Sequence, residues 1–187
     1  PNEKSEPDIL LLGNLQPEIQ LSAINQLNNK PSAIILDTMN YWIENFWETV
    51  KEVISKVDII SINDEESEMI TGQKDLNKAA NILHTMGPKY VIIKKGKKGA
   101  ELFNYEKRYV TGVFDVEKVL DPTGAGDCFI GGISGFLSQS DEISFESIKS
   151  AIDYGTSLAS FNVEEMGTKN LLNLSMNDVQ TRVNKLK

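Results

Sequence analysis

The sequence predicts an α/β fold built on a mainly parallel central sheet. Between residues 8 and 94, apolar runs of strand length alternate with segments of helical spacing. The apolar runs are continuous, which is typical of parallel strands that are covered on both faces. Asp37, Asn63 and Lys94 each stand at the carboxyl end of such a run. Ligands of open α/β sheets bind beyond this end of the strands, so we expect these three side chains to line one active edge.

The first half of the chain carries the regular alternation. Strands are expected at residues 8–13, 33–37, 57–62 and 90–94. Helices are expected at residues 17–27, 41–53, 64–71 and 76–86. The third helix should stop at Gly72 and the fourth at Gly87-Pro88, because glycine and proline end helices.

The second half departs from this rhythm. Residues 100–105 and 108–113 are expected to form a β-hairpin that turns at Glu106-Lys107. Three helices should follow, beginning after Gly126, at Ser144 (reaching about Glu164) and at Ser175. The sequence has no internal repeat, low-complexity tract or interdomain linker, so a single domain over residues 1–187 is expected.

The composition excludes several classes of function. With 40% hydrophobic and 25% charged residues, the 187-residue chain has the balance of an ordinary soluble globular protein. A net charge of −8 argues against a nucleic acid or an anionic membrane as partner. No apolar run approaches the roughly 20 residues of a membrane span.

Cysteine and histidine each occur once, and this limits the chemistry. Cys128 has no intrachain partner, so a cytoplasmic location is expected; the residue is either a small buried helix residue or a reactive thiol. A single histidine, His84, excludes multi-histidine metal sites and argues against a Ser-His-Asp triad. If the protein is an enzyme, its general base should therefore be a carboxylate.

The most informative segment is Asp121-Pro-Thr-Gly-Ala-Gly-Asp127, which precedes an apolar run of helical length. Small residues let the backbone approach a ligand, and the N–H groups of a helix N-terminus attract anions. A carboxylate beside such an anion cradle suits phosphoryl transfer, because it can take the proton of an attacking hydroxyl. The alternative is a glycine-rich helix start at which Asp127 only complements the helix dipole.

Three motifs together resemble the ribokinase-like (PfkB) carbohydrate kinases. Residues 121–132 are similar to the second signature of that family, and Asn63-Asp-Glu-Glu66 resembles its Asn-x-x-Glu motif. Lys94-Lys-Gly96, followed by Gly99-Ala100, resembles the strand end at its nucleotide site. The resemblance implies a ribokinase-like three-layer sandwich and transfer of the γ-phosphoryl group of ATP. It makes Gly124, Ala125 and Gly126 the anion hole and Asp127 the catalytic base.

The resemblance also implies roles at the strand ends, each with a structural alternative. Asn63 and Glu66 would order waters around Mg²⁺, although the same spacing is that of a helix capping box. Asp37, in an Asp-x-x-Asn pattern, would lie near phosphate or metal, or cap the next helix. Lys94 and Gly96 would approach ATP, or belong to a solvated lysine-rich turn.

Further cofactor contacts follow from the resemblance alone. Thr123 would cap the anion-hole helix and face ATP, and Thr156 and Ser160 would contact or flank adenine. Ordinary helix packing is the alternative for all three. Asp121 would bind a monovalent cation such as K⁺, together with loop carbonyls near Gly167, but Leu171 stands where relatives often carry a hydroxyl residue.

The resemblance covers nearly the whole chain but only the C-terminal three-fifths of a family member. The N-terminal part of the family fold, with its lid and sugar site, has no counterpart in this sequence. We therefore expect an ATP-dependent sugar kinase that needs a missing N-terminal half or a homo-oligomer. A nucleoside or a vitamin could replace the sugar, and a non-catalytic fragment that binds nucleotide or a partner chain is the alternative of another class.

Overall fold

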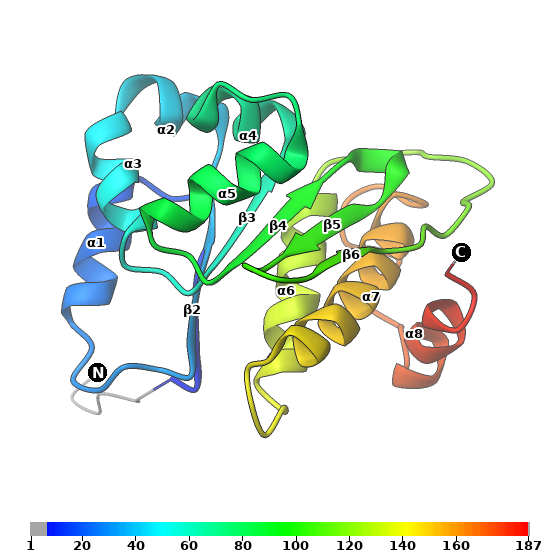
Figure 1. The fold of residues 1–187 in the computed structure, drawn as a ribbon. Helices are drawn as coiled ribbons and strands as arrows, with labels where there is room; N and C mark the ends of the chain where they lie inside the picture. The colour runs from blue at the N-terminus through cyan, green and yellow to red at the C-terminus, as the bar shows by residue number, and fades with distance from the viewer. Residues whose placement is uncertain (1–6, 187) are drawn as a thin grey trace. The chain divides into compact units, whose positions relative to one another are not determined.

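A computed structural model of the chain describes residues 7–186 (Figure 1). The chain divides into two compact units. The first unit comprises residues 1–95 and 101–108, and the second comprises residues 96–100 and 109–187. The single domain over residues 1–187 stays a prediction.

The strands form one six-stranded sheet in the order β1-β2-β3-β4-β5-β6. Their bounds are β1 (Ile9–Leu12), β2 (Ala33–Asp37), β3 (Ile59–Asn63), β4 (Tyr90–Lys94), β5 (Ala100–Phe103) and β6 (Arg108–Val110). The first four strands pair in parallel, which confirms the α/β class with a mainly parallel sheet. In β2, all five residues are buried, in agreement with its continuous apolar sequence.

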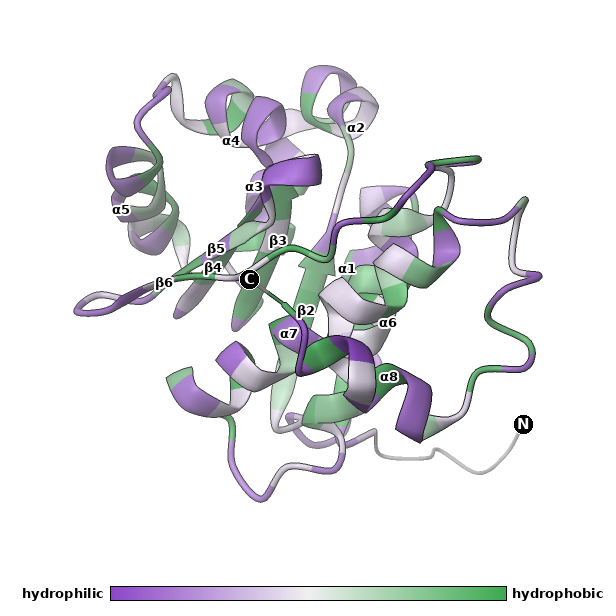
Figure 2. Ribbon diagram, turned by 90° about the vertical axis from the view of Figure 1, so that its right-hand side faces the viewer, coloured by the Kyte–Doolittle hydropathy of each residue, from purple (hydrophilic) through white to green (hydrophobic). Residues whose placement is uncertain are grey.

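Five helices belong to the first unit and cover one face of its strands. They are α1 (Pro17–Asn25), α2 (Asn40–Asn45), α3 (Trp47–Ile54), α4 (Asp64–Thr71) and α5 (Leu76–Met86). Alternate strand residues point to them, so Leu36, Ile62 and Ile93 share one apolar core with Val53 of α3 and Leu83 of α5. Figure 2 shows the hydrophobic residues concentrated along β2 and β3.

The single helix expected at residues 41–53 is wrong, because the chain forms two helices there. Phe46 leaves the helical conformation, with φ −135° and ψ 34°, and stands between α2 and α3. Its ring packs edge-on against Trp42, with 5.4 Å between centroids, and lies 6.2 Å from the ring of Tyr41. The helical spacing of the apolar residues continues across the break, so the hydrophobic pattern alone did not reveal it.

The predicted hairpin is present as β5 and β6, with a slightly earlier turn. Asn104 closes the turn, because its side-chain oxygen accepts hydrogen bonds from the N–H groups of Glu106 (2.9 Å) and Lys107 (2.6 Å). The second strand ends at Val110, three residues before the predicted end. A short 3-10 turn, η1 (Gly96–Lys98), precedes β5.

The second unit is built on α6 (Ala125–Leu137) and α7 (Phe145–Asn162), which pack together, and on α8 (Met176–Val183), which contacts α7. Two glycines allow α6 and α7 to approach closely. A Cβ atom on Gly155 would lie 2.5 Å from the carbonyl oxygen of Phe129, and one on Gly132 would lie 2.9 Å from the Cα of Gly155. The backbones of the two helices therefore meet without side chains between them.

Candidate functional site

The carboxyl edge of the first unit brings three predicted residues together. Asp37, Asn63 and Lys94 are the last residues of β2, β3 and β4, and Asn63 is paired in register with Lys94. The ammonium group of Lys94 donates to Oδ1 of Asp37 at 2.6 Å, and both side chains are largely buried. The N-cap of α2 is Met39, with no side-chain cap, so Asp37 is not the N-cap residue of that helix.

Asn63 and Glu66 form a complete capping box at the start of α4. The N–H of Glu66 donates to Oδ1 of Asn63 at 2.7 Å, and the N–H of Asn63 donates to Oε2 of Glu66 at 2.8 Å. Burial raises the pKa of Glu66 above its ordinary value, although the Asn63 N–H and the charge of Lys94 oppose this shift. The capping interpretation is confirmed, and a role toward Mg²⁺ stays a prediction.

The lysines after β4 differ in their surroundings. Lys95 donates to Oε1 of Glu101 at 2.6 Å, and Arg108 donates to Oε2 of the same carboxylate at 2.8 Å. Burial would raise the pKa of Glu101, but these two cations outweigh it and hold the pKa below its ordinary value. Gly96 and Lys97 are exposed in η1, so the alternative of a solvated turn fits this segment. Lys94 and Lys95, in contrast, are each paired with a carboxylate.

The anion turn lies in the second unit, at the start of α6. Gly124 is the N-cap, with φ 80° and ψ −1°, a left-handed conformation that favours glycine, and no side chain caps the helix. The N–H of Ala125 turns back to the carbonyl of Pro122 at 3.2 Å. Within the described part of the chain, the N–H groups of Gly126 and Asp127 donate to no protein acceptor. These are the donors that the turn leaves open for an anion.

Asp127 stands in the third position of α6, beside these donors. Its side chain is exposed, and among residues 7–186 its carboxylate has no hydrogen-bond or ion-pair partner. A carboxylate in this position can accept a proton from a hydroxyl group that approaches an anion held at the turn. The geometry of this turn fits the predicted base, whose role stays a prediction.

Asn162, the last residue of α7, is a neighbour of the turn that sequence reasoning missed. It is 2% exposed; its Nδ2 donates to the carbonyl of Thr123 at 2.8 Å, and its Oδ1 accepts from the thiol of Cys128 at 3.3 Å. No local sequence pattern indicates this contact, because the two segments lie more than thirty residues apart. Burial and the charge of Asp127 raise the pKa of Cys128, so its thiol stays protonated and the reactive-thiol alternative is not supported.

Asp121 and Thr123 hold the loop before the turn. Asp121 accepts from the N–H of Thr123 at 2.9 Å and from the N–H of Gly167 at 3.4 Å. These bonds, with one from the Thr123 side chain, lower the pKa of Asp121 below its ordinary value. The prediction that Thr123 caps α6 is wrong, because Gly124 is the N-cap and no side chain caps the helix. The monovalent cation at Asp121 stays a prediction.

The two predicted adenine contacts lie on α7. Ser160 is buried; its hydroxyl donates to the carbonyl of Ser157 at 2.6 Å and accepts from Arg182 at 3.0 Å. The Arg182 guanidinium stacks on the ring of Phe161, 3.3 Å from its centroid. Ser160 therefore has a packing role, while Thr156 is half-buried in the same helix. Contact of either residue with adenine stays a prediction.

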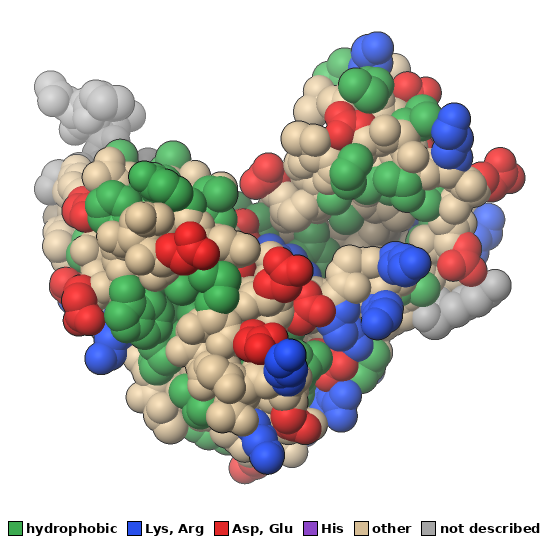
Figure 3. Space-filling view, turned by 90° about the horizontal axis from the view of Figure 1, so that it is seen from above, with side chains coloured by type: hydrophobic (Ala, Val, Ile, Leu, Met, Phe, Trp, Pro, Cys, Tyr) green, Lys and Arg blue, Asp and Glu red, His purple; other side chains and the backbone are tan. Residues whose placement is uncertain are grey.

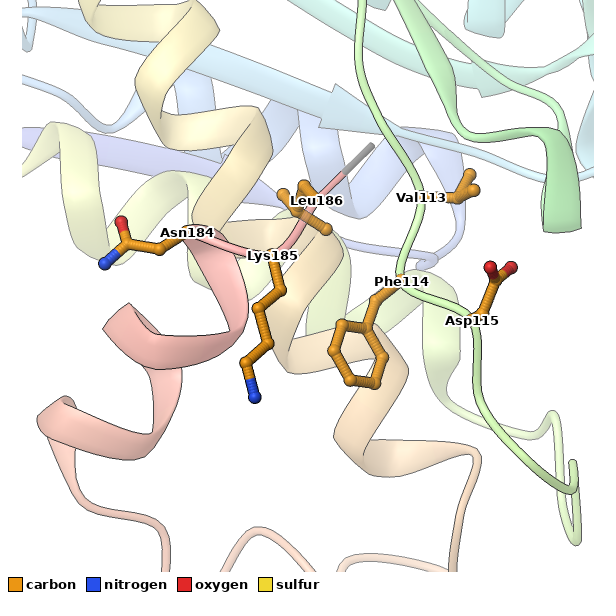
Figure 4. Close-up of a pocket in the computed structure, with 6 residues that line it drawn as sticks. All are labelled: Val113, Phe114, Asp115, Asn184, Lys185 and Leu186. Carbon is orange, nitrogen blue, oxygen red and sulfur yellow. The ribbon is translucent and has the colours of Figure 1, made fainter.

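Two shallow cavities of about 350 and 430 Å³ occur in the second unit. Figure 4 shows the residues that line the first, with the side chains of Phe114 and Lys185 near each other; the lining residues are Val113, Phe114, Asp115, Asn184, Lys185 and Leu186. The second is lined by Phe114, Asp115, Glu117, Lys118, Glu164 and Arg182. None of the predicted site residues lines either cavity.

Other features of the described residues narrow the chemistry. Within residues 7–186, no three His, Cys, Asp or Glu side chains cluster so as to hold a metal ion. A Mg²⁺ ion keeps most of its waters and takes one or two carboxylates plus substrate phosphates, so Glu66 with Asn63 fits that mode of binding.

Within residues 7–186, no helix has the length and apolarity to cross a membrane. Acidic and basic side chains are mixed on the face seen in Figure 3.

Comparison with known proteins identifies the family. Residues 6–174 match the pfkB family carbohydrate kinase. The chain belongs to the pfkB family. A cytidine kinase of Thermococcus kodakarensis is 33% identical over 136 residues, which are 71% of this chain and 48% of that protein. A ribokinase of Staphylococcus aureus is 31% identical over 123 residues, or 63% of this chain and 39% of the relative. The matched part of this pfkB-family chain thus spans at most about half the length of these relatives.

Solved structures have the same fold. The ribokinase of Thermotoga maritima superposes with a TM-score of 0.73 at 26% identity, over 95% of this chain and 57% of that structure. A fructokinase of Vibrio cholerae, solved with fructose, ADP and a calcium ion, gives a TM-score of 0.82 at 18% identity, over 97% of this chain and 62% of the other. The ribokinase-like fold of this pfkB-family chain is therefore established.

Proposed function

We propose that this chain is the nucleotide-binding and catalytic part of an ATP-dependent kinase that phosphorylates a sugar hydroxyl. The observation that carries the proposal is the start of α6. The unpaired N–H groups of Gly126 and Asp127 and the exposed Asp127 carboxylate occur there together, with no side-chain cap. Membership of the pfkB family supports a kinase over a fragment that only binds nucleotide or a partner chain.

The residues of α6 would act together in the reaction. The N–H groups of Gly126 and Asp127 would hold the γ-phosphoryl oxygens of ATP, aided by the positive end of the helix dipole. The Asp127 carboxylate would take the proton of the acceptor hydroxyl as that oxygen bonds to the γ-phosphorus. The bond between the γ-phosphorus and the bridging oxygen breaks, and ADP leaves with the electron pair of that bond.

The residues at the strand ends of the first unit would help to neutralise the negative charge of the ATP phosphates. Bound Mg²⁺ would neutralise phosphate charge, and Asn63 and Glu66 would hold it through water. Divalent charge favours the ionised form of Glu66, whose pKa burial raises, so metal binding and deprotonation of Glu66 would be coupled. The Lys94 ammonium, which is paired with Asp37, stands at the same strand ends.

The molecule that accepts the phosphoryl group is a sugar or a nucleoside in this proposal. Sugar is favoured by the family and by the ribokinase relatives. A nucleoside is favoured by the 33% identity to a cytidine kinase, while no described observation favours a vitamin. Since the chain spans about half the length of such relatives, we infer that residues from outside it, in a missing N-terminal half or a second copy, complete the acceptor site. A cytoplasmic location is part of this proposal.

The test uses the enzyme expressed from its complete gene. ADP release is measured with ATP and Mg²⁺ over a panel of pentoses, hexoses and nucleosides, including cytidine. Selective turnover of one sugar supports the proposal, and selective turnover of a nucleoside supports the second candidate. ATP binding without turnover of any hydroxyl acceptor would contradict both and favour the non-catalytic alternative.

A further inference from the structure

The amide of Asn162 joins the two sides of the anion turn. Its Nδ2 bonds to the Thr123 carbonyl, just before Gly124, and its Oδ1 accepts from Cys128, in the first turn of α6. A Cβ atom on Gly124 would lie 3.8 Å from both terminal atoms of the Asn162 side chain. The amide group therefore packs directly against the turn, and both of its polar ends are used.

This contact fixes the backbone just before the first N–H groups of α6. The first helical hydrogen bond of α6 runs from the N–H of Cys128 to the carbonyl of Gly124 at 2.9 Å, so the N–H groups of Gly126 and Asp127 have no partner within the helix. The carbonyl of Thr123 lies directly before this turn. Asn162 holds that carbonyl, and the N–H of Asp127 has no protein acceptor in the described chain. The N–H of Ala125 shows the alternative, because it folds back onto the carbonyl of Pro122.

Backbone contacts hold the end of α7, which carries Asn162, in place. The carbonyl of Val163, the next residue, accepts from the N–H groups of Leu120 (2.8 Å) and Asp121 (3.3 Å). The close contact of Gly155 with the backbone of Phe129 fixes α7 against α6. Asn162 thus acts from a helix whose position relative to the turn is set by backbone contacts.

We propose that Asn162 is a positioning residue that keeps the N–H groups of Gly126 and Asp127 directed toward the transferring phosphoryl group. This inference rests on the proposed function. In this role Asn162 would contact neither the substrate nor the proton that is transferred to Asp127. It would act through its hydrogen bond to the Thr123 carbonyl. Donors aimed at the transition state raise kcat more than they improve substrate binding.

The kinetic test compares two variants with a matched control on the same helix. Loss of one such donor costs about 10²–10³-fold in kcat, so displacement of the donors in Asn162→Ala should cost about tenfold, with the KM for ATP changed less than about twofold. Asn162→Asp keeps the shape but, when ionised, cannot donate to Thr123; its kcat relative to wild type should therefore recover as the pH falls and the carboxyl group becomes a donor. Ser157→Ala removes a buried hydroxyl that bonds to the Val179 carbonyl, so it should lower the melting temperature without lowering kcat.

A second readout does not depend on kinase activity. Cys128 is the only cysteine, so its alkylation by iodoacetamide reports on the turn. Asn162→Ala should speed this labelling several-fold, because the thiol loses its acceptor, whereas Ser157→Ala should not. If the wild-type enzyme turns over no acceptor, the proposed function fails while the labelling still tests the contact. A kcat of Asn162→Ala within about twofold of wild type in an active enzyme, or unchanged labelling, would overturn the proposal.

Discussion

Three described helix starts carry a carboxylate in the third position, and two of them, α4 and α6, use it in opposite ways. At α4, Glu66 is 5% exposed and turns back onto the N–H of its N-cap, Asn63. At α6, Asp127 is exposed and the N-cap is Gly124, which has no side chain to offer. The first helix start is closed by its own side chains, and the second is left open. The residue at the N-cap makes the difference, because the asparagine side chain accepts from the third N–H and glycine has no side chain to do so.

The other long helices of the second unit strengthen this contrast. The starts of α7 and α8 carry complete capping boxes, formed by Ser144 with Ser147 and by Ser175 with Asp178. An uncapped start leaves N–H groups unsatisfied, which costs stability unless a ligand or water binds them. Helices α1, α2 and α3 also begin without a side-chain cap, and an anion bound at α6, as proposed, would satisfy the open N–H groups there.

The largest expected effect is that of removing the carboxylate at the open start. Asp127→Asn keeps the shape and removes the base, so kcat should fall by about 10²–10⁴-fold while ATP binding is largely retained. The matched control is Asp178→Asn, which removes the carboxylate at the same position of the closed start of α8. Steady-state kinetics and ATP titration measure both variants, and near-normal kcat in Asp127→Asn would contradict the role of the base.

A change at Gly124 would convert the open start toward a closed one. Gly124→Ala introduces a side chain at φ 80° and should cost about 1–2 kcal/mol in the free energy of unfolding. Gly124→Asn should cost less, because asparagine tolerates this conformation, yet its side chain can occupy the open N–H groups and lower kcat. Thermal melts with kinetics separate the two effects. Equal kcat in Gly124→Asn and wild type would show that the open donors are not used.

The closed start at α4 allows the converse test. Asn63→Ala should lower the free energy of unfolding by about 0.5–2 kcal/mol, because it removes the acceptor of the Glu66 N–H. If Asn63 and Glu66 also organise Mg²⁺, Asn63→Ala and Glu66→Ala should each raise the Mg²⁺ concentration needed for half-maximal activity. Melting curves and Mg²⁺ titrations are compared for both variants. A lower melting temperature with an unchanged titration would restrict the pair to capping.

The smallest expected effect concerns pH. The pKa of Glu66 is raised in the folded state, so its stabilising contribution is complete below the unfolded value, about 4.3, and is lost as the pH rises through the folded pKa. Glu66→Gln should therefore gain stability relative to wild type as the pH rises from about 4 to 7.

Glu101→Gln supplies the control of opposite sign. The pKa of Glu101 is lowered, so its contribution is present above about pH 4.3 and is lost as the pH falls through the folded pKa. Its removal should destabilise the protein most at neutral pH. Melting temperatures measured across this range check both variants, and parallel curves for Glu66→Gln and wild type would contradict the burial of a charged Glu66.

Much of this protein follows from the sequence by itself. Continuous apolar runs determined the parallel strands, and glycine and proline determined where α4 and α5 end, because these signals act within a few residues. Equally local patterns in the sequence predicted the capping box at Asn63 and the glycine turn at Gly124 before α6. The break at Phe46 was missed because the apolar spacing runs on through α2 and α3.

Only the tertiary structure decided how distant residues share their polar groups. Lys94 meets Asp37 across 57 positions, and Asn162 reaches Thr123 across 39, through strand order and helix packing that no local pattern encodes. The N–H of Thr123 donates to Asp121, and the Thr123 carbonyl accepts from Asn162 at the end of α7. The physical reason is that a buried polar group must find a partner, and the fold, not the neighbouring sequence, supplies it.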